Sequence, residues 1–282
     1  MSSAAGDGRR TDGIRTVIVG ASGRMGGQLL RMMGEFPALR LHGAVESEHS
    51  PAIGQDATAR AGANASGIRI TASLPPLLER AHLVLDFSHP SSAAATLAAC
   101  VAARVPLLLG TTGLPRELDA PLAAAADAIA LLVAANTSLG VNLMLELVRQ
   151  AAQALPAGYD IEIVETHHRG KRDSPSGTAL ALGAAAAAGR GVSLASQATY
   201  ARHGIGEPRG DDQIGFASVR GGDVVGEHEV WFLGPGERVL LKHSATDRAV
   251  FARGALLAAQ WLAGRTAGRY TMRDVFSNKI IS

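Results

Sequence analysis

The stretch TVIVGASGRMG, residues 16–26, decides the fold class. Its first four residues form a β-branched run typical of a buried strand, and helical spacing follows the glycine-rich segment over residues 28–33. Strand, glycine-rich turn and helix in this order are the context of a dinucleotide-binding turn. The spacing is G-x-x-G-x-x-G, because Ser22 stands where the usual second glycine would be. A glycine-rich turn without any ligand is the common alternative for such a pattern.

An acidic residue follows the second predicted strand. The apolar run 39–45 ends at Glu46, 20 residues beyond Gly26. A carboxylate at this position would bind the ribose hydroxyls of the adenosine half of a dinucleotide. Strand, turn, helix, second strand and acid together favour nucleotide binding over an empty turn.

Strands and helices alternate through the rest of the first half. Further strands are predicted at 82–87, 105–109 and 129–135. Helices are predicted at 77–80, from after residue 90 to residue 103, and at 120–128. Residues 50–67 show no clear period and are expected to form a surface loop. This alternation predicts an α/β fold with a Rossmann-type, doubly wound parallel sheet. Small polar residues follow four of the strands, at 20–26, 87–88, 110–112 and 136–137. Each of these segments by itself is typical of an ordinary turn. If the four strand ends are aligned, the four segments would form one crevice at the carboxyl ends of the strands.

The pattern changes after Ser138. A helix is predicted at 141–155 and strands at 160–164, 216–219, 226–232 and 238–243, separated by short glycine turns. These features predict a second, α+β domain with an open mixed sheet. A long amphipathic helix from 247 through 262 is expected to pack back on the first domain.

The composition excludes several classes of function. The chain has 282 residues, which favours about two domains, and its net charge of 27 − 25 = +2 does not suggest a nucleic-acid partner. One cysteine, Cys100, excludes an internal disulfide framework and fits a reducing compartment. No apolar run reaches the roughly 20 residues that a membrane-spanning helix needs. Residues 1–13 lack the apolar core of a signal peptide, and we expect a disordered tail there.

The stretch ETHHRGKRDSPSGT, residues 165–178, is the strongest functional signal. Five basic side chains precede a predicted helix, which Ser174 or Ser176 can cap and whose first turn suits Pro175. They are His167, His168, Arg169, Lys171 and Arg172. Cations beside a helix N-terminus form a site suited to a carboxylate or phosphate. The alternative is a solvated basic loop, which charge alone would favour.

Lys171 suggests proton transfer as well as anion binding. The chain holds 27 Lys and Arg residues, yet only positions 171, 242 and 279 are lysine. Arginine cannot release its proton in a protein, whereas lysine can, and the two adjacent histidines titrate near neutrality. No set of His, Cys and Asp has the spacing of a zinc site, so we expect no metal.

These motifs resemble the 4-hydroxy-tetrahydrodipicolinate reductase (dihydrodipicolinate reductase) family. The resemblance includes GTTG at 110–113, AAN at 134–136, GFASVRGGDVVGEH at 215–228 and MRDV at 272–275, and it covers residues 17–275. It implies NAD(P)H-dependent reduction of 4-hydroxy-tetrahydrodipicolinate to tetrahydrodipicolinate with loss of water, in the diaminopimelate route to lysine. It also implies a cytoplasmic homotetramer assembled through the sheet of the second domain.

The resemblance also implies roles for individual residues and domains. Residues 14–138 and 248–282 would form the dinucleotide-binding domain, and residues 139–247 the substrate-binding and oligomerisation domain. His167 matches the general acid/base, Lys171 the proton donor, and His168, Gly177 and Thr178 the substrate contacts. The cofactor contacts match Gly20, Ala21, Ser22, Gly23, Arg24, Met25, Glu46, Gly110, Thr111, Thr112, Ala134, Ala135, Asn136 and Thr137.

The chemistry of the residues agrees with this reaction. A substrate with two carboxylates explains cations beside a helix N-terminus. Hydride delivered to an unsaturated cyclic imine leaves electron density that a proton must discharge, so an acid is needed near the ring. Both Lys171 and His167 can supply that proton, and the sequence leaves their order open.

Two positions depart from the family pattern. Ser47 follows Glu46 where an arginine that neutralises the 2′-phosphate of NADPH is known, so we expect NADH to serve at least as well as NADPH. Arg24 or His49 could still reach that phosphate. Thr137 stands where an aromatic residue is common, which leaves the nicotinamide stacking contact without its usual partner.

Two rival functions fit the same fold. A non-catalytic nucleotide-sensing protein would use the same sheet, because a fold does not determine a function, but His167 and Lys171 count against it. A reductase of a semialdehyde or a sugar would not need the cations near Thr178. A thioester-forming semialdehyde enzyme would need a catalytic cysteine, and Cys100 lies within a predicted alanine-rich helix.

Overall fold

The structure, a computed structural model, describes residues 13–280, with side chains described as far as residue 276. Apart from Gly13, the predicted disordered tail therefore lies outside the described residues. The chain divides into two compact units, Met1–Thr137 with Phe251–Ser282, and Ser138–Val250. The second unit begins one residue earlier and ends three residues later than the domain predicted from the sequence. No helix among the described residues is long and apolar enough to cross a membrane.

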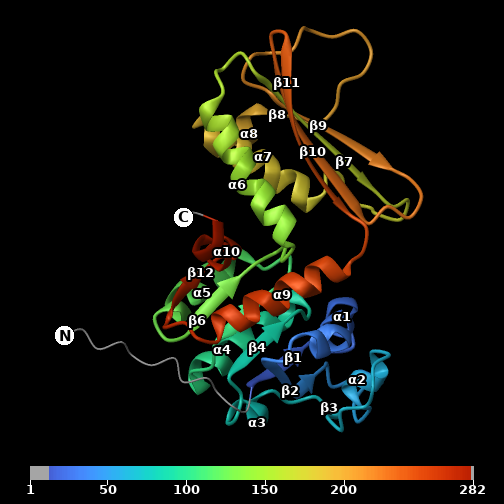
Figure 1. Ribbon diagram of the computed structural model, residues 1–282, viewed down its shortest axis with the longest axis vertical. Helices are drawn as coiled ribbons and strands as arrows, with labels where there is room; N and C mark the ends of the chain where they lie inside the picture. The colour runs from blue at the N-terminus through green and yellow to red at the C-terminus, as the bar shows by residue number, and fades with distance from the viewer. Residues whose placement is uncertain (1–12, 281–282) are drawn as a thin grey trace, which may run out of the picture. The chain divides into compact units, whose positions relative to one another are not determined.

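The first unit is built on a seven-stranded parallel sheet, which confirms the predicted Rossmann-type fold. Its strand order is β12-β6-β5-β4-β1-β2-β3. The strands are β1 (Ile14–Val19), β2 (Leu39–Val45), β3 (Ile70–Thr71), β4 (Leu83–Asp86), β5 (Leu107–Leu109), β6 (Ala130–Val133) and β12 (Gly268–Tyr270) (Figure 1). The α-helices are α1 (Arg24–Met32), α2 (Ala57–Arg60), α3 (Pro75–Leu78), α4 (Ala93–Ala103), α5 (Asp119–Ala126), α9 (Ala249–Leu262), whose first two residues are counted with the second unit, and α10 (Met272–Ile280). Short 3-10 helices are η1 (Met33–Glu35), η2 (Pro90–Ser92) and η3 (Arg116–Leu118).

The strand order places a topological switch point beside β1. From β1 the chain moves outward to β2 and β3, then returns to the other side of β1 through β4, β5 and β6. Ligands of doubly wound sheets bind outside the carboxyl ends of the strands at such a point. The central strands are fully buried, as parallel strands covered on both faces require.

Some short elements were missing from the sequence prediction. Strands β3 and β12 have two and three residues, too few to show a period of their own. Helix α2 lies inside the segment that we predicted to be irregular. Its N-cap is Asp56, whose side chain accepts hydrogen bonds from the backbone N–H groups of Thr58 and Ala59.

The second unit holds a five-stranded mixed sheet with the order β11-β10-β7-β9-β8. Strand β10 runs antiparallel to β7 and β11, whereas β7, β9 and β8 are parallel, which confirms the predicted open mixed sheet. The strands are β7 (Asp160–His167), β8 (Ala198–Thr199), β9 (Ile214–Arg220), β10 (Gly226–Gly234) and β11 (Glu237–Ala245). The helices are α6 (Leu139–Ala154), α7 (Gly177–Arg190) and α8 (Leu194–Gln197).

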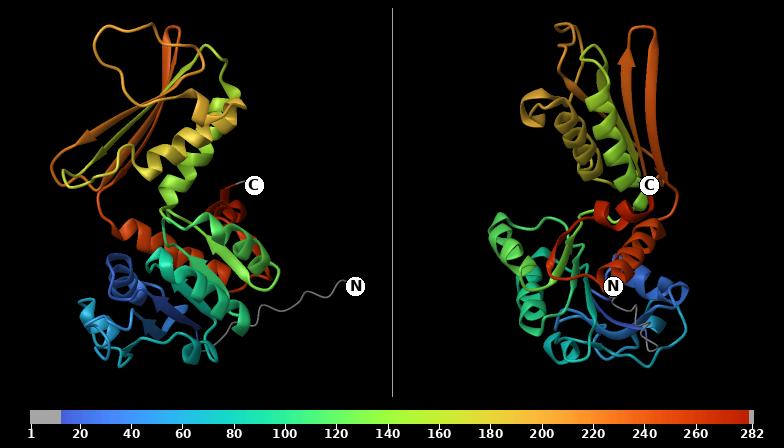
Figure 2. Two further views of the ribbon diagram at one scale, coloured as in Figure 1. Left: turned by 180° about the vertical axis from the view of Figure 1, so that it is seen from behind. Right: turned by 60° about the vertical axis from the view of Figure 1, so that its left-hand side comes forward.

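Helices cover one face of this second sheet. Figure 2 shows α6 and α7 on the same side of the strands. Burial alternates along β7 and β10 accordingly, because successive side chains point to opposite faces. The covered face carries an apolar core that includes Ile161, Ile163, Val230 and Phe232.

The covered face also buries polar side chains at one end. His228 of β10 is 4% exposed and lies directly across from Glu165 of β7 and His243 of β11. Its Nε2 lies 3.1 Å from the hydroxyl of Ser176. Burial, aided by the nearby His167, His243 and Lys171 and opposed by the charge of Glu165, lowers the pKa of His228 from 6.5 to about 4. His228 is therefore neutral in the folded protein near pH 7.

This buried histidine predicts a loss of stability in acid. Because the pKa of His228 is lower in the folded than in the unfolded chain, the unfolded chain binds the proton first, and stability falls between about pH 6.5 and about pH 4. We expect His228→Gln to remove about 2 to 3 kcal/mol of the loss in unfolding free energy between those two pH values. Urea unfolding at both pH values measures it. His203→Gln, in an exposed loop, is the control, and equal losses in wild type and His228→Gln would contradict the prediction.

Candidate functional site

The glycine-rich turn after β1 brings helix α1 close to the strand end. Gly20 has a positive φ of 79°, and a Cβ atom on Gly26 would lie 2.1 Å from the carbonyl oxygen of Gly20. No larger residue fits at position 26 without a shift of the backbone. The N-cap residue of α1, Gly23, provides no side-chain hydrogen bond, so no capping side chain covers the first turn of the helix. Such an end suits a phosphate group.

The carboxylate of Glu46 lies against this turn. Its Oε2 accepts hydrogen bonds from the backbone N–H of Ser22 at 2.9 Å and from the Ser22 hydroxyl at 2.6 Å, and its Oε1 accepts one from the N–H of Ser47 at 2.9 Å. Burial alone would raise the pKa of Glu46, but the hydrogen bonds from Ser22 and Ser47 outweigh it and lower the pKa. The Ser22 hydroxyl therefore holds the ionised carboxylate of Glu46 at the turn, and a glycine at this position would lack that hydrogen bond.

The other predicted cofactor residues follow strands whose ends are aligned. Asp86, the last residue of β4, is paired with Val19 of β1 and with Leu109 of β5, and Leu109 is paired with Val133 of β6. The segments 20–25, 110–112 and 134–137 therefore leave the sheet at the same edge, as does Glu46 after β2. The structure brings all the predicted cofactor residues to this edge of the first unit.

Two residues at this edge have structural contacts that the sequence did not reveal. Asp86 is fully buried, and its Oδ1 accepts hydrogen bonds from the N–H of Ser88 at 2.9 Å and from the hydroxyl of Thr111 at 3.3 Å. Thr137 is 2% exposed, and its hydroxyl donates to the carbonyl oxygen of Phe251 at 2.7 Å. Thr137 is thus used inside the first unit, where it offers no aromatic surface for stacking.

In the second unit, Glu165 and His167 point to the same face of β7 because they are two residues apart on a strand. The strand was predicted to end at 164 and in fact runs on to His167. His167 Nδ1 lies 2.5 Å from Glu165 Oε2. Burial lowers the pKa of His167, and the cations Lys171 and Arg220 add to this against the effect of Glu165.

Glu165 is 1% exposed and binds more groups than His167 alone. Arg220 of β9 donates from Nη1 to Oε2 at 2.8 Å and from Nη2 to Oε1 at 2.7 Å, and the N–H of Ser176 donates to Oε1 at 3.1 Å. Burial alone would raise the pKa of Glu165, but the hydrogen bonds from Arg220 and His167 lower it to about 2. Glu165 is therefore ionised at neutral pH.

Lys171 lies in the loop between β7 and α7. Its Nζ donates to the two carboxylate oxygens of Asp173 at 2.9 and 2.8 Å, and its side chain is 20% exposed. Next to the strand end, His168 Nε2 lies 3.3 Å from Nη2 of Arg248. The predicted proton donor and a predicted substrate contact are thus held beside the end of β7 by charged partners.

Helix α7 presents its N-terminus in the same region. Ser176 is its N-cap, and its hydroxyl accepts a hydrogen bond from the N–H of Ala179 at 3.1 Å. Pro175 precedes the cap, so our placement of Pro175 in the first turn was wrong, and of the two serines considered it is Ser176 that caps the helix. The first turn begins with Gly177 and Thr178, and a Cβ atom on Gly177 would meet no other atom within 4 Å.

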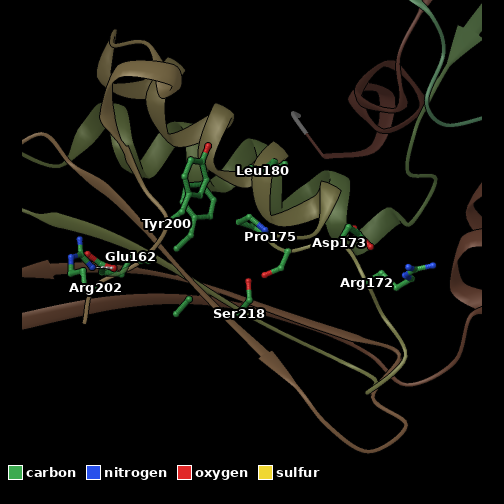
Figure 3. Close-up of a pocket in the computed structure, with 12 residues that line it drawn as sticks. Glu162, Arg172, Asp173, Pro175, Leu180, Tyr200, Arg202 and Ser218 are labelled. Carbon is green, nitrogen blue, oxygen red and sulfur yellow. Dashed lines mark hydrogen bonds and ion pairs between the residues drawn. The ribbon is translucent and has the colours of Figure 1, made fainter. Parts of the chain in front are cut away.

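A hollow of about 1060 Å³ is lined in part by residues 172–175, which directly follow Lys171 in the loop. Figure 3 shows Pro175 and Leu180 along it, with Tyr200 and Ser218 facing them. Its lining includes neither Glu165, His167 nor Lys171. The lining does include Asp173, the partner of Lys171, and Ser218, which hydrogen-bonds Glu165, so the hollow adjoins this cluster without containing those three residues.

Sequence reasoning missed several members of this cluster. Arg220 and His228 belong to the stretch that carried the family resemblance, but neither was assigned a role, and Arg248 and Glu165 were not assigned one either. Arg220 and Glu165 are 55 residues apart in the sequence, and only the pairing of β7 with β9 brings them together. No group of His, Cys, Asp and Glu within the described part of the chain could hold a metal ion.

Family models match nearly the whole chain. The model described as "Dihydrodipicolinate reductase, N-terminus" matches residues 14–137, and the model described as "Dihydrodipicolinate reductase, C-terminus" matches residues 140–276. The boundary between the two matches falls at the boundary between the two compact units.

Curated relatives and a solved structure agree with the family models. The 4-hydroxy-tetrahydrodipicolinate reductase of Anaeromyxobacter dehalogenans is 48% identical over 93% of this chain and 97% of its own length. That of Thiobacillus denitrificans is 46% identical over 94% and 99%. The dipicolinate-bound dihydrodipicolinate reductase of Paenisporosarcina sp. TG-14 has the same fold, with a TM-score of 0.73, 22% identity and coverage of 92% and 97%. The chain therefore belongs to the dihydrodipicolinate reductase family, whose curated members are named 4-hydroxy-tetrahydrodipicolinate reductase, and it is an oxidoreductase of that family.

Proposed function

We propose that the first unit binds NADH or NADPH and that the second unit binds and protonates 4-hydroxy-tetrahydrodipicolinate, which is reduced to tetrahydrodipicolinate with loss of water in lysine biosynthesis. The observation that carries the proposal is the cluster of His167, Glu165 and Arg220 beside Lys171 and the start of α7. Family membership supports the reaction. The cytoplasmic location expected from the sequence stays a prediction.

The residues of the first unit fit a pyridine dinucleotide. The start of α1 has no capping side chain, and the close approach at Gly26 brings this helix end to the strand, so its backbone N–H groups suit a phosphate group. The ionised Glu46 can accept hydrogen bonds from ribose hydroxyls. When bound, the reduced nicotinamide supplies the hydride.

The second unit fits a small ring with two carboxylates. Lys171 and Arg248 provide positive charge near the end of β7, and the start of α7 adds backbone N–H groups at Gly177 and Thr178. The solved Paenisporosarcina relative is described as dipicolinate-bound, which supports a heterocyclic dicarboxylate as the ligand class. The substrate would compete with Asp173 for the ammonium group of Lys171.

Protonation of the reduced ring is assigned to Lys171 and His167 together. His167 has a lowered pKa and is neutral near pH 7, whereas the ammonium group of Lys171 is paired with a carboxylate. Lys171 can therefore deliver a proton to the ring. Neutral His167 can accept a proton and so take part in reprotonating the site. A purely regulatory nucleotide-binding protein would need neither group.

Substitution of Lys171 tests this assignment. We expect Lys171→Ala to lower kcat by about 100-fold or more while the affinity for NADH stays within about threefold. Lys171→Arg keeps the charge but cannot release a proton, so it should keep KM for the substrate better than it keeps kcat. Steady-state rates with the heterocycle and fluorescence titration with NADH measure both quantities.

The control for Lys171 is Arg172→Ala, which removes a neighbouring exposed cation and should keep kcat within about threefold. Normal turnover of Lys171→Ala would argue against a proton-transfer role and against the enzyme mechanism proposed above.

The contacts of Glu46 predict the cofactor preference. The ionised Glu46 is followed by Ser47, which carries no charge to offset repulsion of a 2′-phosphate, so we expect kcat/KM for NADH to equal or exceed that for NADPH. Ser47→Arg should raise the NADPH to NADH ratio of kcat/KM by about tenfold. Ser73→Arg adds the same charge to an exposed position of the same unit and is the control. A strong NADPH preference of the wild-type enzyme would refute this expectation and would make Arg24 and His49 the candidates for binding the phosphate.

The face of the second sheet opposite α6 and α7 supports assembly into a homotetramer. Leu240 is 53% exposed and Val219 49% exposed, and Leu240 lies directly across from Trp231 on this face. Lys242 forms ion pairs with Glu227 and Glu229 beside them. An exposed face that mixes apolar side chains with paired charges is typical of an interface between subunits.

Replacing Leu240 tests the assembly. We expect the wild-type protein to have a mass near four times 29.0 kDa, and Leu240→Arg to dissociate it into smaller species. Light scattering after size-exclusion chromatography measures the mass. Ile53→Arg, at an exposed apolar residue of the first unit, is the control. A monomeric wild-type protein would exclude the proposed tetramer.

A further inference from the structure

The carboxylate of Glu165 is the centre of a hydrogen-bond network built from three separate segments. Its two oxygens accept hydrogen bonds from Arg220 of β9 and from the backbone N–H of Ser176, at the start of α7. One of them also contacts the ring nitrogen Nδ1 of His167 on β7. Glu165 is 1% exposed and His167 8% exposed, whereas the Arg220 side chain is 20% exposed, so the carboxylate and the ring are the shielded part of the network. These bonds hold the carboxylate against the His167 ring.

This network determines which nitrogen of His167 carries hydrogen. An ionised carboxylate can only accept hydrogen bonds, and the two bonds from Arg220 hold Glu165 in its ionised form. The Nδ1 atom of His167, 2.5 Å from Oε2, must therefore be the donor. In the neutral imidazole the other nitrogen, Nε2, then has a free lone pair, and in the charged imidazole it has the proton to give away.

The space beside Nε2 depends on a glycine of the neighbouring strand. A Cβ atom on Gly226, the first residue of β10, would lie 3.0 Å from His167 Nε2 and 3.3 Å from its Cδ2. These distances are shorter than ordinary van der Waals contact, so a Cβ atom at position 226 would require the His167 ring to shift by a few tenths of an ångström. Gly226 does not have a positive φ, so its backbone conformation does not require glycine. The lack of space beside the His167 ring is what favours glycine here.

We propose that Glu165 and Gly226 are positioning residues for His167: Glu165 holds the ring as the Nδ1–H tautomer, and Gly226 leaves Nε2 open as the atom that exchanges the proton. The inference deepens the proposed function and rests on it. Neither residue contacts the reacting atoms, and both act through His167. The same carboxylate also anchors Ser176, so the proton-exchanging ring and the start of the anion-binding helix α7 share one support.

A purely structural role for Glu165 would also explain its burial. In that case the tautomer of His167 would not depend on Glu165, and loss of the carboxylate would lower stability without a specific effect on the ring. The two ring nitrogens report the difference directly, because their chemical shifts distinguish the two neutral tautomers and the charged form.

The first measurement uses the unmodified, ligand-free protein. Long-range proton–nitrogen spectra of histidine-labelled protein at about pH 8, with His167→Gln to assign the signals among the nine histidines, should show His167 with a protonated Nδ1 and an unprotonated Nε2. In Glu165→Gln the same signals should move toward a mixture of both tautomers. A wild-type His167 with its hydrogen on Nε2 would overturn the proposal.

The second measurement is turnover. We expect Glu165→Gln and Gly226→Ala each to lower kcat by about 10- to 100-fold, and Gly226→Ala, which leaves Glu165 and Ser176 in place, to keep KM for the heterocycle within about threefold. Gly221→Ala is the matched control, because a Cβ atom there would meet no other atom within 4 Å, and it should keep both constants. Unchanged kcat in Gly226→Ala would overturn the role assigned to that residue.

The two measurements separate this inference from the proposed function. An inactive wild-type enzyme would refute the proposed reaction, while the nitrogen shifts would still decide whether Glu165 fixes the tautomer of His167. A wild-type enzyme that turns over the heterocycle, together with a Glu165→Gln variant that keeps both the tautomer and kcat, would refute the inference and leave the proposed function standing.

Discussion

An ion pair between the buried carboxylate of Glu165 and the partly exposed guanidinium of Arg220 organises the second unit. A carboxylate removed from water is costly unless it is paired and all of its acceptor positions are used. Arg220 pairs with both oxygens of Glu165, and the N–H of Ser176 and the ring of His167 fill the remaining directions. Because these donors come from β9, α7 and β7, the ion pair fixes where two strands and a helix meet. The chemistry at the end of β7 depends on that junction.

The first unit relies on close backbone approach instead of charge pairing. The contact between Gly26 and the carbonyl of Gly20 sets where α1 begins relative to β1, and Ser22 brings the acid of β2 to the same turn. The aligned pairing of β1, β4, β5 and β6 then places the remaining turn segments at one edge of the sheet. A small number of local contacts therefore assembles an edge suited to a dinucleotide.

Much of this architecture follows from local sequence, and the rest does not. The β-branched run before Gly20 and the alternation of strands with helices predicted the parallel sheet, and the basic stretch from Glu165 to Thr178 predicted where charged groups would gather. Strands β3 and β12 were invisible because two or three residues carry no period. The contacts of Arg220 and His228 with β7 arise from strand pairing across more than fifty residues, which no local pattern reveals. The residues themselves suggested proton transfer at Lys171 and His167, and the family resemblance gave each its separate role; both roles stay predictions.

The bond between Thr137 and Phe251 has a consequence for how such a chain can be built. The residue before the second unit and the residue after it lie within one hydrogen bond of each other, 2.7 Å, although 114 positions separate them in the sequence. The second unit is thus inserted into the first, and the two points where the chain passes between the units are adjacent. Deletion of residues 138–250 would leave two ends that a very short linker can join. Another domain whose own termini lie close together could be inserted at the same place without a change in the strand order of the parallel sheet.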